Sequence, residues 1–581
     1  MQSHCKLFIL LLFILLTLGS GAPRSFGSSL VPVVAPRAMV ASVNQLASRA
    51  GVQMMKSGGN AVDAAVAVGF VLAVVHPQAG NLGGGGFMLV RFADGTTHFI
   101  DYREKAPAAA TANMYLDAQG NVIEDASTIG YKAIGVPGSV AGMVYAEKKY
   151  GKLSLARVMA PAIKLAEEGF ALAAEDARDL QEDKQLGQFQ ESRRVFQREG
   201  NYYKADEMFK QPDLARTLKH IAGHPDDFYH GDLARELAAS VQKGGGLITV
   251  DDLAHYEVKE REAVRGSYRG YEIISAPPPS SGGTTLIEIL NILEGYDLGA
   301  FGRRSAPVMH LTLEAFRRAF FDRAEFLGDP DFSNIPVAQL IDKRYGAAWR
   351  ESIDPKHASV SKDLIRPAIF SQLEQYAAGH LPPGPVAEPD HTTHYSVVDP
   401  EGNAVAVTTT LNDSFGSRVT AEGLGFLLND EMDDFAAKQG VPNMFGLIQG
   451  PANAIGPGKR PLSAMAPTIV LKGGKLFLVL GSPGGPRIIT TVANILMGVV
   501  DYGMNIQEAV NAPRLHHQWL PDVARVEQGF SPDAIKRLEE MGHRIDAQDH
   551  WSDGECIMID PKRGERLGAS DQRNNGRAMG F

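Results

Sequence analysis

The sequence predicts an α+β fold, in which strands and helices occupy different stretches of one layered body. Apolar and polar residues alternate over Thr393–Val398, and a second strand pattern covers Ala404–Thr410 after a Pro-Glu-Gly-Asn turn. Residues 468–471 and Lys475–Leu480 flank a Gly-Gly turn in the same way. The C-terminal third therefore contains two hairpins, whereas residues 135–373 are mostly helical in pattern.

Further elements are predicted near the N-terminus. Residues 44–56 form a helix that ends at Ser-Gly-Gly, and Asn60 caps a second helix over Ala61–Val75. That second helix is apolar nearly all round, so we expect it to be deeply buried. Residues 87–92 and 97–103 form a hairpin around Asp-Gly. Since strands occur in both halves of the chain, we expect a single co-folded body.

Three stretches have more than one interpretation. The glycines at 83–86 precede a strand rather than a helix, which predicts close backbone packing and not a nucleotide-binding loop. Residues 308–326 form an amphipathic helix whose charges of both signs predict a solvated, ion-paired face. The stretch from about 440 to 461 is long for a connection, which favours a functional loop.

Composition excludes some classes of function. The chain has 581 residues, of which 44% are hydrophobic and 21% charged, as in soluble globular proteins. Its formal net charge of -10 argues against a nucleic-acid partner.

The N-terminus has the pattern of a signal peptide over residues 1–22. It contains Lys6, an apolar run over 7–16 and small residues to Ala22. We expect an exported protein, periplasmic or secreted, with no stable membrane span after signal removal; an uncleaved anchor remains the alternative.

Cysteine and histidine usage predicts neither a disulfide nor a metal site. Only Cys5 and Cys556 occur, and Cys5 lies within the signal, so Cys556 is expected to be a small buried residue. His391 and His394 would point to opposite faces of a strand. GxSxG, HExxH and CxxC patterns are absent from the sequence. We therefore predict no metal and no cofactor.

The junction between His391 and Thr392 separates a Pro- and Gly-rich linker, 381–389, from the strand over Thr393–Val398. It is either a domain boundary or a cleavage point. A threonine hydroxyl alone is a weak nucleophile, but a free α-amine with a reference pKa of about 7.7–8.0 is a usable base. A threonine that becomes an N-terminus would combine both groups.

Four motifs resemble those of the γ-glutamyltransferases (γ-glutamyltranspeptidases). They are Thr-Thr-His-Tyr-Ser-Val-Val-Asp at 392–399, Asn-Asp-Glu-Met-Asp-Asp-Phe at 429–435, Lys-Arg-Pro-Leu-Ser at 459–463 and Gly-Ser-Pro-Gly-Gly at 481–485. The resemblance implies a four-layer αββα sandwich of N-terminal-nucleophile hydrolases, with two stacked antiparallel sheets flanked by helices. It also implies self-cleavage into a large subunit, 23–391, and a small subunit, 392–581.

The resemblance further implies a γ-glutamyltransferase and glutathione hydrolase. Its substrates would be glutathione and other γ-glutamyl compounds, with water, amino acids or peptides as acceptors. Thr392 would be the nucleophile and its α-amine the base, with Thr410 as a hydrogen-bonding neighbour. Gly484 and Gly485 would stabilise the oxyanion through their N–H groups. The implied substrate-binding residues are Arg103 and Ser463 for the carboxylate, and Asn412, Glu431 and Asp434 for the ammonium group.

Two positions depart from the family pattern. Ala464 replaces a second serine that often contacts the substrate carboxylate, and Phe445 stands where a tyrosine is common in the lid loop. These changes bear on the substrate and on the balance between hydrolysis and transfer, and not on the fold or the nucleophile. Two alternative functions stay open: an acylase for glutaryl-type amides, or an uncleaved exported binding protein. Glu431 and Asp434 argue against the acylase, because a substrate without an ammonium group would leave both carboxylates unpaired.

Overall fold

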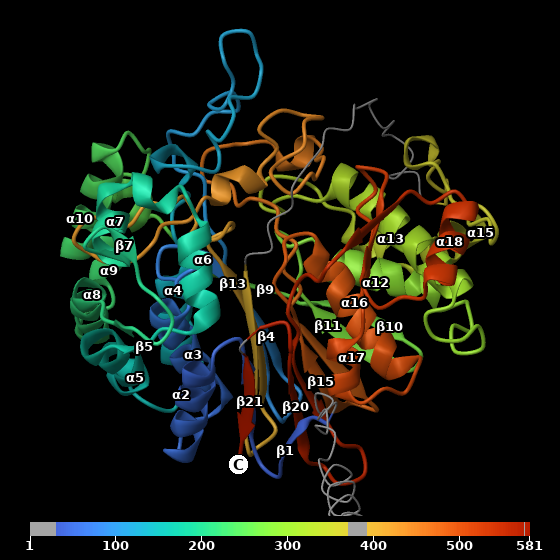
Figure 1. Ribbon diagram of the computed structural model, residues 1–581, viewed down its shortest axis with the longest axis horizontal. Helices are drawn as coiled ribbons and strands as arrows, with labels where there is room; N and C mark the ends of the chain where they lie inside the picture. The colour runs from blue at the N-terminus through green and yellow to red at the C-terminus, as the bar shows by residue number, and fades with distance from the viewer. Residues whose placement is uncertain (1–30, 370–391, 575) are drawn as a thin grey trace, which may run out of the picture.

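The computed structural model describes residues 31–369, 392–574 and 576–581 (Figure 1). The predicted signal peptide (1–22), the linker (381–389) and His391 lie outside the described residues. No described helix has both the length and the apolar character needed to cross a membrane.

Two seven-stranded sheets form the centre of the molecule, and neighbouring strands in both are antiparallel. The first sheet has the order β21 (Arg577–Gly580), β2 (Met39–Ser42), β12 (Thr393–Val398), β13 (Ala404–Thr410), β3 (Gly85–Arg91), β4 (Thr97–Tyr102) and β9 (Lys259–Arg261). The second has the order β1 (Val33–Ala35), β20 (Arg566–Ser570), β19 (Glu555–Ile559), β15 (Lys475–Leu480), β14 (Thr468–Lys472), β11 (Tyr271–Ser275) and β10 (Val264–Tyr268).

Alternating side chains bury both faces of the first sheet. In β3, Phe87 and Leu89 join the apolar core between the sheets, whereas Met88 and Val90 join the core under the helices. Figure 1 shows helices on the outer face of each sheet. Those over the first sheet include α2 (Gln45–Lys56), α3 (Ala61–Val75) and α4 (Ser139–Tyr150); those over the second include α12 (Gly282–Leu293), α13 (Ala306–Phe326) and α16 (Arg487–Val500). The four-layer αββα prediction is confirmed.

The predicted N-terminal elements are confirmed in detail. Asn44 caps α2, and Asn60 caps α3 by accepting from the backbone N–H groups of Val62 and Asp63. Every residue of α3 is buried, as its apolar composition predicts. The glycine run packs against backbone: a Cβ at Gly83 would lie 2.2 Å from the Leu427 carbonyl oxygen.

The interpretation of the stretch 135–373 as mostly helical is incomplete, because it contains β9, β10 and β11. The expected solvated face on α13 is wrong. Glu314, Arg318 and Asp322 are buried, and they make their contacts inside the protein. Glu314 pairs with Arg318 at 2.5 Å, and Asp322 accepts from the Tyr345 hydroxyl at 2.6 Å. Elements that follow α13 in the chain cover the charged side, which the helical pattern could not reveal.

The two predicted subunits share a sheet. Strands β12 and β13 lie between β2 and β3, with Tyr395 opposite Ser42 and Thr410 opposite Gly85. Neither segment could complete this sheet without the other, which supports one co-folded body.

Candidate active site

Thr392 immediately precedes β12, where the chain enters the first sheet. Its side chain is buried, and its Oγ1 lies 3.2 Å from the Oγ1 of Thr410, at the end of the paired strand β13. Thr410 Oγ1 also accepts from the Asn412 N–H at 2.9 Å. The hairpin thus fixes the two hydroxyl groups against each other.

His394 is the histidine nearest to Thr392 along β12, and it does not provide a base. It is fully buried, and its Nδ1 hydrogen-bonds the Thr408 hydroxyl at 2.9 Å. Burial lowers the pKa of His394 to about 3, so the ring is neutral near pH 7. His394 therefore does not act as the base for the Thr392 hydroxyl.

Gly484 and Gly485 form the turn that leads into α16. Both have positive φ, +120° and +51°, which favours glycine. A Cβ at Gly485 would lie 2.8 Å from the Phe445 ring. Gly485 lines the same pocket as Thr392, so the positive end of the α16 dipole lies at the pocket.

Arg103 is buried at the end of β4 and is held by carboxylates. Its Nη1 donates to Glu431 and its Nη2 to Asp434, while its Nε donates to the Pro461 carbonyl at 3.2 Å. Although burial alone lowers the pKa of the guanidinium, Glu431 and Asp434 raise it above its ordinary value. The structure brings together the groups predicted for opposite ends of a zwitterion, and in it they neutralise each other.

Glu431 and Asp434 belong to the short helix η5 (Glu431–Asp434). The Glu431 N–H donates to Asn429 Oδ1 at 3.0 Å, and Asn429 donates to the Gly83 and Gly135 carbonyls at 2.7 and 2.9 Å. Burial raises the pKa of Glu431 well above its ordinary value, with Arg103 acting in the opposite direction. The glycine run therefore contributes to the site by holding the loop that carries these acids.

Asn412 has a φ of +81° and is fixed by an acid that sequence reasoning missed. Its Nδ2 lies 3.2 Å from the carbonyl and 3.3 Å from Oδ2 of Asp430. With Nδ2 engaged as a donor, Oδ1 is the atom of the side chain that can accept a hydrogen bond. This is the polarity that an ammonium group requires. The position of Asp430 within the motif at 429–435, directly before Glu431, was the signal that could have placed it at the site.

The other wall of the pocket combines Ser463, Ala464 and Met465 with Phe445 and Leu447 from the long loop. Ser463 is fixed by backbone hydrogen bonds to Pro279 and Ser281, at 2.9 and 2.8 Å. The loop is tied down beside the pocket, because Asp433 accepts from the Met444 N–H at 3.1 Å. Burial raises the pKa of Asp433 to about 7.

Arg323 of α13 also lines the pocket, and sequence reasoning assigned it no role there. It was included among the charges of the helix that were expected to be solvated, but it is only 2% exposed. Nothing in the sequence around Arg323 indicates that its side chain faces the pocket. The predicted site residues other than His391 and Gly484 all line this pocket. They are Thr392, Thr410, Gly485, Arg103, Asn412, Glu431, Asp434 and Ser463.

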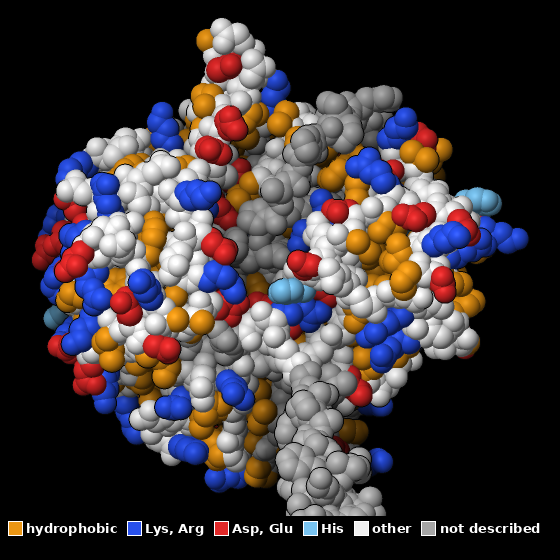
Figure 2. Space-filling model, in the orientation of Figure 1, with side chains coloured by type: hydrophobic (Ala, Val, Ile, Leu, Met, Phe, Trp, Pro, Cys, Tyr) orange, Lys and Arg blue, Asp and Glu red, His pale blue; other side chains and the backbone are white. Residues whose placement is uncertain are grey.

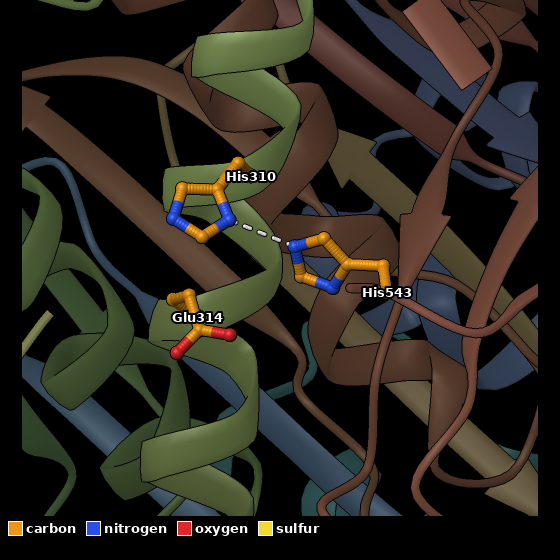
Figure 3. A group of neighbouring side chains, drawn as sticks. All are labelled: His310, Glu314 and His543. Atoms are coloured by element: carbon orange, nitrogen blue, oxygen red, sulfur yellow. Dashed lines mark hydrogen bonds between the residues drawn. The ribbon is translucent and has the colours of Figure 1, made fainter. Parts of the chain in front are cut away.

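One trio of buried side chains has the composition of a metal site (Figure 3). His310 and Glu314 of α13 face His543, and their ligand atoms lie within 4.8 Å of one another. His310 Nε2 lies 2.8 Å from the Asp354 carbonyl and therefore carries the proton, so Nδ1 accepts from His543 Nε2 at 2.8 Å. Glu314 is paired with Arg317 and Arg318. These hydrogen bonds and two cations fit a structural network better than a divalent metal.

Charged side chains of both signs are mixed on the visible surface. On the face shown in Figure 2, Lys and Arg side chains are interspersed with Asp and Glu, and the described residues of this face form no continuous basic area. That distribution does not resemble a nucleic-acid interface.

Comparison with known proteins identifies the family to which this chain is similar. A family model described as Gamma-glutamyltranspeptidase matches residues 47–581. The glutathione hydrolase proenzyme of Escherichia coli (strain K12) is 50% identical over 546 residues, or 94% of this chain and 91% of that protein. The protein of the same name from Pseudomonas sp. (strain A14) is 49% identical over 572 residues, covering 95% and 96%. The solved structure of the cephalosporin acylase from Bacillus halodurans aligns with a TM-score of 0.82 and 27% identity, over 97% of this chain and 99% of that one. The chain belongs to the gamma-glutamyltranspeptidase family.

Proposed function

We propose that this chain is a self-cleaving γ-glutamyltransferase and glutathione hydrolase in which Thr392 is the nucleophile. The observation that carries the proposal is the position of Thr392. Its hydroxyl is held by Thr410 at 3.2 Å in a pocket that also contains Arg103, Glu431 and Asp434. Its relatives from Escherichia coli and Pseudomonas are named glutathione hydrolase proenzymes, which supports the same activity.

Maturation creates the catalytic base. The Thr392 hydroxyl attacks the carbonyl carbon of His391, the peptide bond to Thr392 breaks, and the resulting ester is hydrolysed. The products are a carboxylate on His391 and a free α-amine on Thr392. Because β12 and β13 lie within a sheet completed by strands of the preceding segment, the two chains stay associated as a heterodimer.

Turnover repeats the same chemistry on a γ-glutamyl amide. The α-amine of Thr392 accepts the hydroxyl proton as Oγ1 attacks the γ-carbonyl carbon. The N–H groups of Gly484 and Gly485 stabilise the oxyanion. The proton then passes to the leaving nitrogen, the C–N bond breaks, and a γ-glutamyl ester forms on Thr392. Water or the amine of an amino acid or peptide attacks this ester and restores the enzyme.

Recognition depends on exchange of ion pairs. The substrate ammonium group takes the place of the Arg103 guanidinium beside Glu431, Asp434 and Asn412. The freed fork of Arg103 pairs with the substrate carboxylate, assisted by Ser463. The exchange conserves charge, since one cation and one anion enter a site that already holds both.

Export is part of the proposal. The signal pattern over 1–22 and the absence of cysteine pairs fit a periplasmic or secreted enzyme that acts on extracellular γ-glutamyl compounds. The chemistry itself requires no metal or cofactor.

A glutaryl-type acylase is the second candidate, and the aligned cephalosporin acylase structure is the observation that favours it. The acidic pair Glu431 and Asp434 distinguishes the two. An ammonium group satisfies both carboxylates, whereas a glutaryl group brings a further carboxylate and no cation to pair with them. The first function is therefore preferred.

The test is the rate of anilide release from γ-glutamyl-p-nitroanilide, with and without glycylglycine, alongside glutaryl-p-nitroanilide. We expect cleavage of the γ-glutamyl compound, acceleration by glycylglycine, and little release from the glutaryl compound. Preference for the glutaryl compound would establish the acylase instead.

The role of Thr392 is tested by denaturing electrophoresis. Thr392→Ala should remain one chain and be inactive, because both cleavage and turnover need its hydroxyl. Thr393→Ala is the matched control, since the buried Thr393 Oγ1 makes no hydrogen bond in the structure. It should yield two chains and active enzyme. Normal processing of Thr392→Ala would remove Thr392 from its role.

A further inference from the structure

Arg323 is a buried cation that has no ion-pair partner among the residues the structure describes. It is 2% exposed, and its Nε donates to the Ser281 hydroxyl at 2.9 Å. Its Nη1 is buried and makes no hydrogen bond in the structure. Among the residues that the structure describes, no carboxylate oxygen comes within 4.0 Å of it. Two other arginines of the same helix differ, because Arg317 and Arg318 both pair with Glu314.

A buried guanidinium with no carboxylate beside it costs free energy in the protein without a bound ligand. A guanidinium taken out of water loses its hydration, and normally a paired carboxylate offsets the loss. Burial lowers the pKa of Arg323 to about 10, and Asp434 is the one charged group that opposes this effect. A buried charge that lacks a partner in a pocket is typical of a group that binds a ligand of opposite charge.

The location of Arg323 indicates which ligand. It lines the pocket together with Thr392, Ser463 and Ala464. Its hydrogen-bond partner Ser281 also donates from its own hydroxyl to the Ser463 carbonyl, at 2.6 Å. Arg323 is therefore coupled to the wall that faces a bound carboxylate in the proposed function, at the point where Ala464 supplies no hydroxyl.

Arg103 has to exchange its existing partners before it can bind that carboxylate. Its Nη1 and Nη2 are both paired with acids of η5, and its Nε with the Pro461 carbonyl. Arg323 has a free donor and no competing carboxylate in contact. Once the substrate ammonium group has displaced Arg103 from Glu431 and Asp434, a substrate carboxylate bound by both guanidinium groups would also neutralise Arg323.

We propose that Arg323 is a specificity-determining residue that binds the α-carboxylate of the γ-glutamyl donor together with Arg103 and Ser463. The inference rests on the proposed function and adds a second cation to the site. It assigns to Arg323 the recognition that a hydroxyl at 464 would otherwise provide. A purely structural arginine would affect folding and all substrates alike, whereas this role is confined to donors that carry the carboxylate.

The experiment compares two anilides. L-γ-Glutamyl-p-nitroanilide carries both the ammonium and the carboxylate, and 4-aminobutyryl-p-nitroanilide has the same chain without the carboxylate. For Arg323→Met we expect kcat/KM on the first to fall by roughly ten- to hundredfold, mainly through KM, and on the second to change by less than about twofold. Arg323→Lys should fall between the variant and the wild type, because it keeps the charge without the fork.

Folding is controlled within the same experiment. The ratio of the two kcat/KM values cancels any loss of active enzyme, and processing into two chains is checked on each preparation. If Arg323→Met does not process, the ratio in Arg323→Lys decides. Ala464→Ser is then added to the wild type and to Arg323→Lys. The hydroxyl should improve binding of the γ-glutamyl donor more in Arg323→Lys, since there it replaces a weakened contact.

The outcomes separate the two proposals. A wild-type enzyme that does not cleave the γ-glutamyl anilide contradicts the proposed function itself. Cleavage by the wild type, with a donor ratio that is unchanged in Arg323→Met and Arg323→Lys, overturns only the role of Arg323. Additive effects of Ala464→Ser in the two backgrounds also count against the shared task of positions 323 and 464.

Discussion

Replacing Thr410 by valine removes one hydroxyl from the centre of the site while keeping the shape of the side chain. Thr410 Oγ1 lies 3.2 Å from the Thr392 Oγ1 and accepts from the Asn412 N–H at 2.9 Å. Thr410 is 3% exposed, so water cannot easily replace the lost hydroxyl. The variant therefore tests whether the orientation of the Thr392 hydroxyl depends on its neighbour.

The magnitude follows from the geometry. The 3.2 Å separation is longer than the usual 2.7–2.8 Å between hydroxyl oxygens, so this contact belongs to the weaker hydrogen bonds. A loss of about 0.5–1 kcal/mol in transition-state stabilisation corresponds to roughly a two- to fivefold lower kcat/KM. The unsatisfied Asn412 N–H costs a further amount in stability, about 1–3 kcal/mol.

The assay is anilide release from γ-glutamyl-p-nitroanilide, with the rate of self-cleavage followed by electrophoresis. Thr408→Val is the matched control. It lies two residues earlier on β13, and its hydroxyl bonds His394 Nδ1 at 2.9 Å rather than Thr392. We expect Thr408→Val to lose stability but to keep kcat/KM within about twofold. Equal losses of activity in both variants, or none in Thr410→Val, would refute the reasoning.

Three further changes have defined outcomes. Arg103→Lys should raise KM for γ-glutamyl donors and lower Tm, because one ammonium group cannot pair with both Glu431 and Asp434. Steady-state kinetics and thermal melts measure the two effects, and unchanged KM and Tm would contradict this reasoning. Ala464→Ser should lower KM for the same donors, and an unchanged KM would show that the missing hydroxyl is unimportant. Burial raises the pKa of Glu147 to about 9 beside Asp63, so the folded protein keeps a proton that the unfolded chain releases near pH 4–5. The contribution of Glu147 to stability should therefore fall as pH rises from about 5 to 9, and the Tm advantage of Glu147→Gln should grow over that range; an advantage that does not vary with pH would exclude this origin.

Local patterns were sufficient for much of the fold. The period-two alternation in Thr393–Val398 and Ala404–Thr410 predicts two strands, and the structure has both with those bounds. The Asn60 cap and the apolar character of Ala61–Val75 likewise predict the buried helix α3. These signals are carried by neighbouring residues, so a single sequence contains them.

Contacts between segments that are distant in the chain were harder to predict from the sequence. Arg103 pairs with Glu431 and Asp434 across more than three hundred positions, and the separate motifs do not show that these residues neutralise each other. Arg323 is the clearer case. Helical spacing places it among exposed charges, but the segments that bury it come from elsewhere in the chain, so its position in the pocket was not predictable.

The central claim is that Thr392 becomes an N-terminus and carries the acyl group. Intact-mass spectrometry of the purified enzyme, before and after rapid mixing with a γ-glutamyl donor, tests both parts. We expect a small chain with the mass of residues 392–581, which gains one γ-glutamyl group on the N-terminal peptide. A single uncleaved chain, a small chain that begins at Thr393, or an acyl group mapped to another residue would contradict the account.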